Sequence, residues 1–275
     1  MSESPQRWRV KKAARKAVVL GSFASSSIAV RRLTGGTRVR AITYHRFGHA
    51  ERDPWCVAPH AFEEQMRWLA EQKLAVSLDD VLRFARGEIE LASGSVLVTM
   101  DDGFSSVLTE AAPVLRRYRI PSVAFITTQA IGDPDAGKGA GEAFLTWEQV
   151  AALSATGMTI GSHGRTHRSM AKLGLDEVRT EGQQSKRLIE THLGKAVTSF
   201  AYPYGMRNDE SAATARILAE CGYSSIFISQ HGTVERGANP LRLPRIKVEA
   251  GEPLWMFKLL CKGGMDAWSL ADRVL

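Results

Sequence analysis

Short apolar segments alternate with amphipathic segments from residue 41 onward, and this alternation constrains the fold more than any other feature. The apolar segments have the length and the β-branched content of strands that are buried on both faces. Seven can be distinguished, at 41–45, 95–100, 122–128, 158–162, 199–202, 224–229 and 242–248. Most of the intervening segments have the apolar spacing of helices, which predicts parallel strands joined by helical crossovers.

Seven such strands predict a (β/α)7 barrel, and a doubly wound open sheet is the structural alternative. The length of 275 residues fits one large α/β domain. Both folds collect ligands at the carboxyl ends of their parallel strands. Side chains that carry chemistry should therefore follow directly after strands.

Two adjacent acids, Asp101 and Asp102, end the second strand and precede Gly103. Like charges side by side repel each other, and burying them together raises the cost. Because glycine permits a sharp turn, both carboxylates can face one cleft at the end of the strand. Two acids that cap a following helix are the alternative explanation of the pair on its own.

Two histidines, His163 and His167, follow the fourth strand at a spacing of four residues. If this segment turns helically, both imidazoles share one face, as metal ligands do on a helix. Two neutral imidazoles and one carboxylate make a three-ligand site with positions left open for water and substrate. One aspartate then binds the metal while the other is free to accept a proton. Two solvated loop histidines are the alternative.

The segment 200–205, Phe-Ala-Tyr-Pro-Tyr-Gly, ends the fifth strand. Its proline and its final glycine fix a sharp turn, which can point a backbone N–H into the same cleft. Alternatively, the segment is a hydrophobic turn that packs on the core.

In this order, the three motifs resemble those of the NodB-type polysaccharide deacetylases, carbohydrate esterase family 4. Residues 99–103, Thr-Met-Asp-Asp-Gly, are similar to the family's first motif, Thr-Phe-Asp-Asp-Gly. The His-x-x-x-His pair and the turn at 202–205 resemble its second and third motifs, and 43–45 and 243–246 resemble one branch of the family. The resemblance covers roughly residues 41–248.

This resemblance implies a distorted (β/α)7 barrel of the NodB type. We divide the chain into a basic, partly apolar N-terminal arm at 1–40 and a barrel with a C-terminal extension at 41–275. The resemblance implies a hydrolase that removes an N-acetyl group from an amino sugar of the GlcNAc type in a poly- or oligosaccharide and releases acetate. A divalent metal is implied as well, with Zn²⁺ as the first expectation and Co²⁺ or Ni²⁺ as alternatives. The implied catalytic base is Asp101. The implied metal ligands are Asp102, His163 and His167, and the implied oxyanion donor is the backbone N–H of Tyr204.

Two positions depart from the family pattern. The arginine that begins the third motif in many members, where it orients the base, is replaced by Ala201, and Arg245 in the last strand is the candidate to supply that charge. The late Leu-x-His motif that carries the family's general acid is missing, and His45 and His231 are the candidates by residue type. His45 closes the first strand and is the better placed of the two, whereas His231 lies in a loop.

Other functions compete with N-deacetylation. A deformylase or an O-acetyl esterase acting on a related sugar is the hydrolytic alternative. An inactive glycan-binding barrel is the non-catalytic alternative, and the intact Asp101 and full metal triad argue against it. The expected partner is an N-acetylated glycan, either free or lipid-linked.

Residues 1–40 carry the basic charge of the chain. They hold ten Lys and Arg residues against one acid, a charge of +9, whereas the whole chain sums to +7, so 41–275 carry −2. Because the main domain is not basic, binding of nucleic acid is not expected.

The apolar stretch 17–30 within this arm has three interpretations. Beside so many basic residues it is typical of a helix that lies on an anionic membrane, and the alternatives are a solvated tail and a signal peptide or anchor. We expect a peripheral contact with the inner face of the membrane and a cytoplasmic location, with export as the alternative. The three separated cysteines form no Cys-x-x-Cys pair and indicate a reducing compartment.

Overall fold

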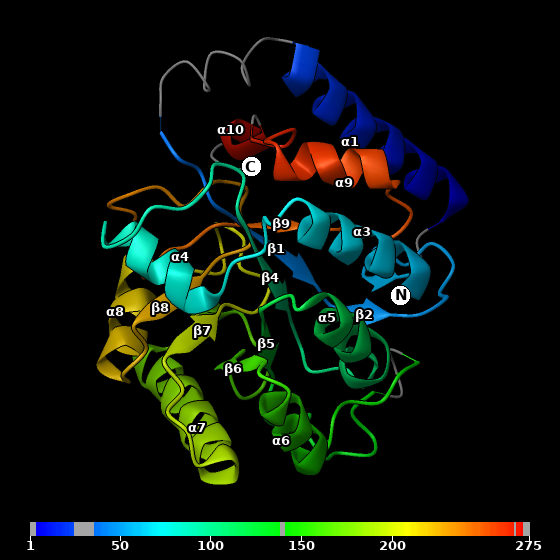
Figure 1. Ribbon diagram of the computed structural model, residues 1–275. Helices are drawn as coiled ribbons and strands as arrows, with labels where there is room; N and C mark the ends of the chain where they lie inside the picture. The colour runs from blue at the N-terminus through cyan, green and yellow to red at the C-terminus, as the bar shows by residue number, and fades with distance from the viewer. Residues whose placement is uncertain (1–3, 25–35, 138–140, 267, 272–275) are drawn as a thin grey trace.

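Seven parallel strands form the centre of the computed structural model, which describes residues 4–24, 36–137, 141–266 and 268–271 (Figure 1). The order of the strands across the sheet is β8-β7-β6-β5-β4-β1-β9. Each overlaps one of the predicted strands, so the alternation seen in the sequence is confirmed. Their bounds are β1 (Arg40–Tyr44), β4 (Val96–Met100), β5 (Ser122–Ile126), β6 (Thr159–Ser162), β7 (Ser199–Ala201), β8 (Ser225–Phe227) and β9 (Arg245–Lys247).

The chain at β9 nearly closes the sheet into a barrel. On one side β9 pairs with β1, where Ala41 lies opposite Arg245. On the other side the residues just before β9 reach β8, because Leu243 forms a parallel bridge with Phe227 and its N–H donates to the carbonyl of Ile226 at 2.8 Å. The predicted barrel is therefore confirmed, and the alternative of an open sheet is wrong.

Helices cover the outside of the barrel, and their ends follow the capping residues of the sequence. Thr146 and Gln149 form a capping box at the start of α6, and Gly194 ends α7 in the left-handed region at φ 62°. The helical segment after β4 begins as the π-helical turn η1 before it continues as α5. The bounds are α3 (Pro59–Glu71), α4 (Leu78–Ala85), η1 (Val107–Ala111), α5 (Ala112–Tyr118), α6 (Trp147–Ala155), the 3-10 turn η3 (Met170–Lys172), α7 (Leu175–Leu193), α8 (Ala212–Glu220), α9 (Leu254–Cys261) and α10 (Trp268–Ala271).

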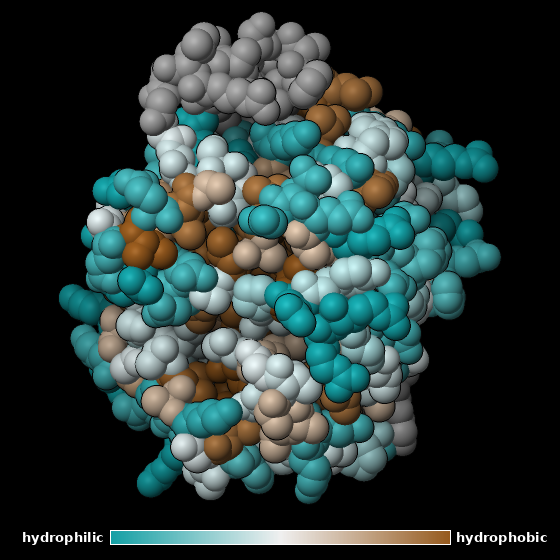
Figure 2. All heavy atoms as spheres, in the orientation of Figure 1, coloured by the Kyte–Doolittle hydropathy of each residue, from teal (hydrophilic) through white to brown (hydrophobic). Residues whose placement is uncertain are grey.

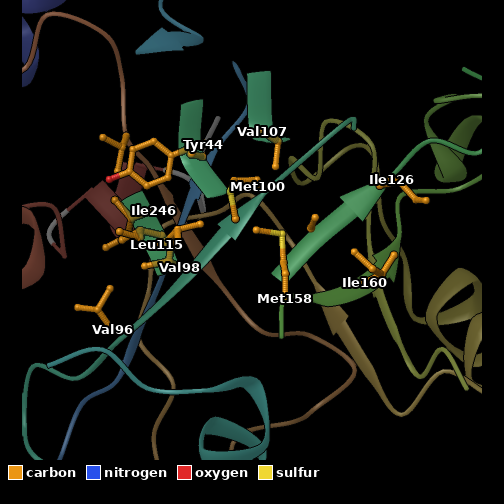
Figure 3. Close-up of a cluster of buried hydrophobic side chains, with 14 of the residues drawn as sticks. Tyr44, Val96, Val98, Met100, Val107, Leu115, Ile126, Met158, Ile160 and Ile246 are labelled. Carbon is orange, nitrogen blue, oxygen red and sulfur yellow. The ribbon is translucent and has the colours of Figure 1, made fainter. Parts of the chain in front are cut away.

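Two apolar clusters lie on the two sides of the strands. Figure 3 shows part of the larger one, in which Val98 and Met100 of β4 lie near the helical residues Val107 and Leu115. The alternate residues of the strands, such as Leu97 and Phe125, belong to the second cluster with side chains of α4. This second cluster fills the barrel interior, and it explains why the strands are apolar on both faces.

The segment between β1 and α3 was not predicted as regular structure. It contains a small parallel sheet of β2 (Arg46–Phe47) and β3 (Cys56–Val57). Strands of two residues are too short to show a periodicity of two, which is why the sequence pattern does not reveal them. The loop between them places Asp53 and Trp55 beside the carboxyl end of β1.

The first part of the N-terminal arm is the helix α1 (Pro5–Ala24), which packs beside α9 (Figure 1). Its Val19 is fully buried. Lys12 lies 2.9 Å from Glu249, and Arg15 lies 2.6 Å from Glu252, with all four side chains buried. The interpretation of the arm as a solvated tail is therefore wrong for this helix.

The apolar stretch at 17–30 lies only partly within the described residues. Residues 25–35 lie outside the described residues, so the signal-peptide interpretation is not addressed by the structure. Among the described helices, none has the length and hydropathy needed to cross a bilayer.

Candidate metal and catalytic site

The chain turns sharply where β4 ends, and this turn separates the two adjacent carboxylates. Asp102 and Gly103 both have positive φ, 74° and 92°. A Cβ atom on Gly103 would lie 3.0 Å from Ile131 and 3.2 Å from Ile126, so this turn requires glycine. Both carboxylates consequently line one cavity instead of pointing to opposite faces of a strand.

Asp102, His163 and His167 converge as predicted. The Nε2 atoms of the two histidines lie 3.4 and 3.2 Å from Oδ1 of Asp102, and the three ligand atoms all lie within 4.8 Å of one another. That Oδ1 is buried yet accepts no hydrogen bond. Buried polar atoms are rarely left in this state, so this oxygen fits a ligand of a cation.

The protonation of His163 suits a metal ligand. Its Nδ1 lies 2.8 Å from the carbonyl oxygen of Ala201, to which Nδ1–H donates, so the lone pair of Nε2 faces Asp102. Burial lowers the pKa of His163 to about 4, which keeps the ring neutral. Two imidazole nitrogens and one carboxylate oxygen are the ligands that Zn²⁺ and similar ions accept, so the residues present fit such an ion.

Asp101 is held by Arg245, the residue proposed to replace the missing arginine of the third motif. The guanidinium crosses the barrel interior and donates to both carboxylate oxygens, at 2.6 and 2.8 Å. Arg245 is fully buried and Asp101 is 2% exposed. Burial alone would raise the pKa of Asp101, but the nearby guanidinium brings this pKa below its usual value.

The turn at 202–205 forms part of the wall of the cavity, through Tyr204. Tyr204 has φ 62° and its ring lies 4.9 Å from that of His167. A Cβ atom on Gly205 would lie 2.7 Å from the backbone nitrogen of Ser229, so this position also requires glycine. The turn therefore borders the metal triad, as the sequence predicted, and the oxyanion role of the Tyr204 N–H stays a prediction.

The two candidates for the general acid lie in different places. His45 lines the same cavity as Asp101 and His163, and its ring lies 4.6 Å from Trp55. His231 lines a separate cavity with Arg242. Only His45 is thus positioned beside the metal triad.

The cavity that holds these residues has a volume of about 300 Å³. Sequence reasoning missed several side chains in its wall, among them Trp55, Phe104 and Lys247. Phe104 directly follows the first motif in the sequence, and this position could have indicated that its side chain lines the cavity. Trp55 and Lys247 belong to segments with no motif of their own.

A family profile described as polysaccharide deacetylase matches residues 89–226. The chain belongs to the polysaccharide deacetylase family. Members of this family are hydrolases that act on amide bonds, so the predicted family and enzyme class are confirmed.

Two curated relatives resemble the chain over most of its length. YxkH of Bacillus subtilis (strain 168) is 25% identical over 191 residues, which are 69% of this chain and 64% of that protein. A poly-β-1,6-N-acetyl-D-glucosamine N-deacetylase of Staphylococcus aureus (strain MRSA252) is 22% identical over 204 residues, which are 70% of this chain and 68% of that protein. The chain thus spans about two thirds of the length of these relatives.

Solved structures share the fold. Streptococcus pyogenes deacetylase PplD in complex with acetate matches with a TM-score of 0.72 and 20% identity, over 81% of this chain and 97% of that chain. IcaB from Ammonifex degensii matches with a TM-score of 0.70 and 24% identity, over 83% of this chain and 97% of that chain. The predicted barrel of the NodB type is confirmed by these matches.

Proposed function

We propose that this protein is a metal-dependent deacetylase that hydrolyses the N-acetyl group of an amino sugar within a poly- or oligosaccharide and releases acetate. The observation that carries the proposal is the placement of the paired Asp101 and Arg245 beside the triad of Asp102, His163 and His167 in one cavity. The similarity to the poly-β-1,6-N-acetyl-D-glucosamine N-deacetylase supports a substrate of the GlcNAc type.

Each side chain has a task in this reaction. Arg245 keeps Asp101 ionised, so that Asp101 can accept the proton of the attacking water. We assign to the Tyr204 N–H the donation to the oxygen that becomes negative, a contribution of roughly 3–4 kcal/mol for a well-placed donor. His45 is the proton donor to the leaving amine. A divalent ion bound at the triad would polarise the acetamido carbonyl and lower the pKa of a water molecule.

The surroundings of the triad favour a chain of sugars over a single sugar. A second cavity of about 570 Å³ lies next to the first, and the two share Asp102, Phe104 and His167 in their walls. In the second cavity the rings of Phe104 and Phe144 stack at 4.6 Å. Aromatic rings therefore line both cavities, Trp55 the first and the Phe104–Phe144 stack the second. Such surfaces accept the apolar faces of consecutive sugar rings.

An acetate-release assay tests the proposed function. Oligomers of β-1,6-linked N-acetylglucosamine should release acetate when the protein is loaded with Zn²⁺ or Co²⁺. N-formylated and O-acetylated analogues test the alternatives of a deformylase and an esterase. Binding of the oligomer by the metal-loaded protein without release of any acyl group would instead indicate an inactive glycan-binding barrel.

We also propose that α1 contacts the inner face of an anionic membrane. There a lipid-linked glycan would be held close to the barrel. The face of α1 that points away from the barrel exposes Val10 (64%) and Leu20 (52%), with the exposed basic residues Arg7, Arg9 and Lys16 along the same helix. Figure 2 shows apolar side chains among hydrophilic ones at the upper edge of the molecule, where α1 lies. Apolar residues flanked by cations are typical of interfacial helices.

A further inference from the structure

Glu181 of α7 is a buried acid that contacts the segment between the two histidine ligands. Its side chain is 5% exposed. Its carboxylate accepts hydrogen bonds from the N–H of Arg165 at 2.7 Å, from the N–H of Thr166 at 2.9 Å and from the hydroxyl of Thr166 at 2.5 Å. All three donors lie between His163 and His167 in the chain.

No Lys, Arg or His side chain among the described residues forms an ion pair with Glu181. An ionised carboxylate is costly to bury unless other groups compensate its charge. In this protein the compensation comes from two backbone N–H groups and a hydroxyl of the histidine loop. Because these are charge-assisted hydrogen bonds, they are stronger than bonds between neutral groups.

The histidine loop has an unusual backbone that needs such support. Gly164 has φ 80° and His167 has φ 57°. A Cβ atom on Gly164 would lie 3.2 Å from the Glu181 carboxylate, so the loop packs closely against this acid. A left-handed conformation at a residue other than glycine persists only when its surroundings enforce it.

The opposite edge of the same loop is fixed by the segment after β5. The N–H groups of Thr128 and Gln129 donate to the carbonyls of Gly164 and Arg165, at 3.2 and 2.9 Å. The loop is thus held through its carbonyl groups on one side and through its N–H groups by Glu181 on the other. Removing Glu181 would leave one side without support.

We propose that Glu181 is a positioning residue that preorganises His163 and His167 for the metal. This proposal rests on the proposed function, since it assumes that the triad binds a divalent ion. Glu181 touches neither histidine ring through a hydrogen bond, and it acts by fixing the backbone from which both rings project. Groups that orient metal ligands in this way typically contribute about 10- to 100-fold in metal affinity.

Titration of the full chain with Co²⁺ alone, against a competing chelator, tests this role. Glu181→Gln keeps the size of the side chain but replaces an accepting oxygen by an amide NH₂. We expect the dissociation constant for Co²⁺ to rise about 10-fold or more and the visible absorption of the bound Co²⁺ to change. Thr166→Val, which removes only the hydroxyl contact, should give a smaller rise and provides the answer if Glu181→Gln does not fold.

Glu190→Gln is the matched control, because Glu190 lies on the same helix and accepts a hydrogen bond from the backbone N–H of Val197 at 2.9 Å. It should leave the affinity for Co²⁺ unchanged. Normal Co²⁺ affinity in Glu181→Gln, or an equal loss in Glu190→Gln, would overturn the proposal. These outcomes can be distinguished from a failure of the proposed function, because in that case the unmodified protein would bind Co²⁺ but release no acetate.

Discussion

At the scale of single residues, the two neighbouring aspartates should have separable roles. Asp101→Asn keeps the volume but removes the basicity, so the metal should stay bound while turnover falls by about 10²-fold or more. Asp102→Ala removes a ligand, so metal content itself should fall. Metal analysis together with an acetate-release assay distinguishes the two effects. Loss of metal in Asp101→Asn, with retention in Asp102→Ala, would mean that the roles are reversed.

The pair of Asp101 and Arg245 makes a second prediction at this scale. In the proposed reaction Asp101 works as an ionised base, so activity should be lost as the pH falls through its pKa. Arg245 lowers that pKa, and its replacement in Arg245→Met leaves burial to raise it. The acid limb of the pH–rate profile should therefore move to higher pH.

Arg245→Lys is the control for this pH prediction, since it keeps the charge without the bidentate geometry and should shift the limb less. Arg245→Met also leaves a buried carboxylate unpaired, which costs about 3–5 kcal/mol of stability. The profile is therefore recorded below the unfolding temperature of each variant. An acid limb at its original position in an active Arg245→Met variant would show that Arg245 only packs in the barrel.

At the scale of elements, local patterns predicted the seven strands and the strand-end positions of Asp101, Asp102, His163 and His167. The reason is that each depends on residues close together in the sequence. The docking of α1 could not be predicted, because Lys12 and Glu249 lie 237 positions apart and neither belongs to a motif. The wall formed by Trp55 was missed for a different reason, since two-residue strands carry no readable period.

The ion pairs beneath α1 should be strongly coupled. Lys12→Glu would place a third carboxylate beside Glu249 and Glu252 in a buried position, so we expect it to lower the free energy of unfolding by about 3–5 kcal/mol. The charge exchange of Lys12→Glu with Glu249→Lys should recover part of that loss. Denaturant unfolding of the two single variants and the double variant measures the coupling. Strictly additive effects would show that this pair does not hold the helix.

One further contact connects α1 to the cavity of the metal triad. Arg15 also donates to the carbonyl of Lys247 at 3.1 Å, and Lys247 lines the cavity beside Trp55. The arm therefore supports the strand that carries Arg245, although it lies outside the segment matched by the family profile. In the exchanged variant, recovery of stability should accordingly be accompanied by recovery of deacetylase activity.

At the scale of the whole molecule, two groups of basic side chains can be distinguished on α1. Lys12 and Arg15 face the barrel and are engaged by acids, whereas Arg7, Arg9 and Lys16 are exposed. Among the basic residues of α1, it is the exposed group that is available to an anionic surface, where each basic residue contributes about 1 kcal/mol. The net attraction to a membrane is therefore smaller than the charge of +9 on residues 1–40 suggests.

The full chain should sediment with vesicles that contain anionic lipid, and high salt should weaken this binding because it screens the charges. The double variant Val10→Glu with Leu20→Glu should bind less, since it places acids on the apolar face of α1. The control is Leu175→Glu with Leu188→Glu, two exposed leucines of α7 on another part of the surface. Equal binding by both double variants would show that α1 is not the contact. Cleavage near Ala29 with secretion would show that the arm is a signal peptide, and the proposed cytoplasmic location would then be wrong.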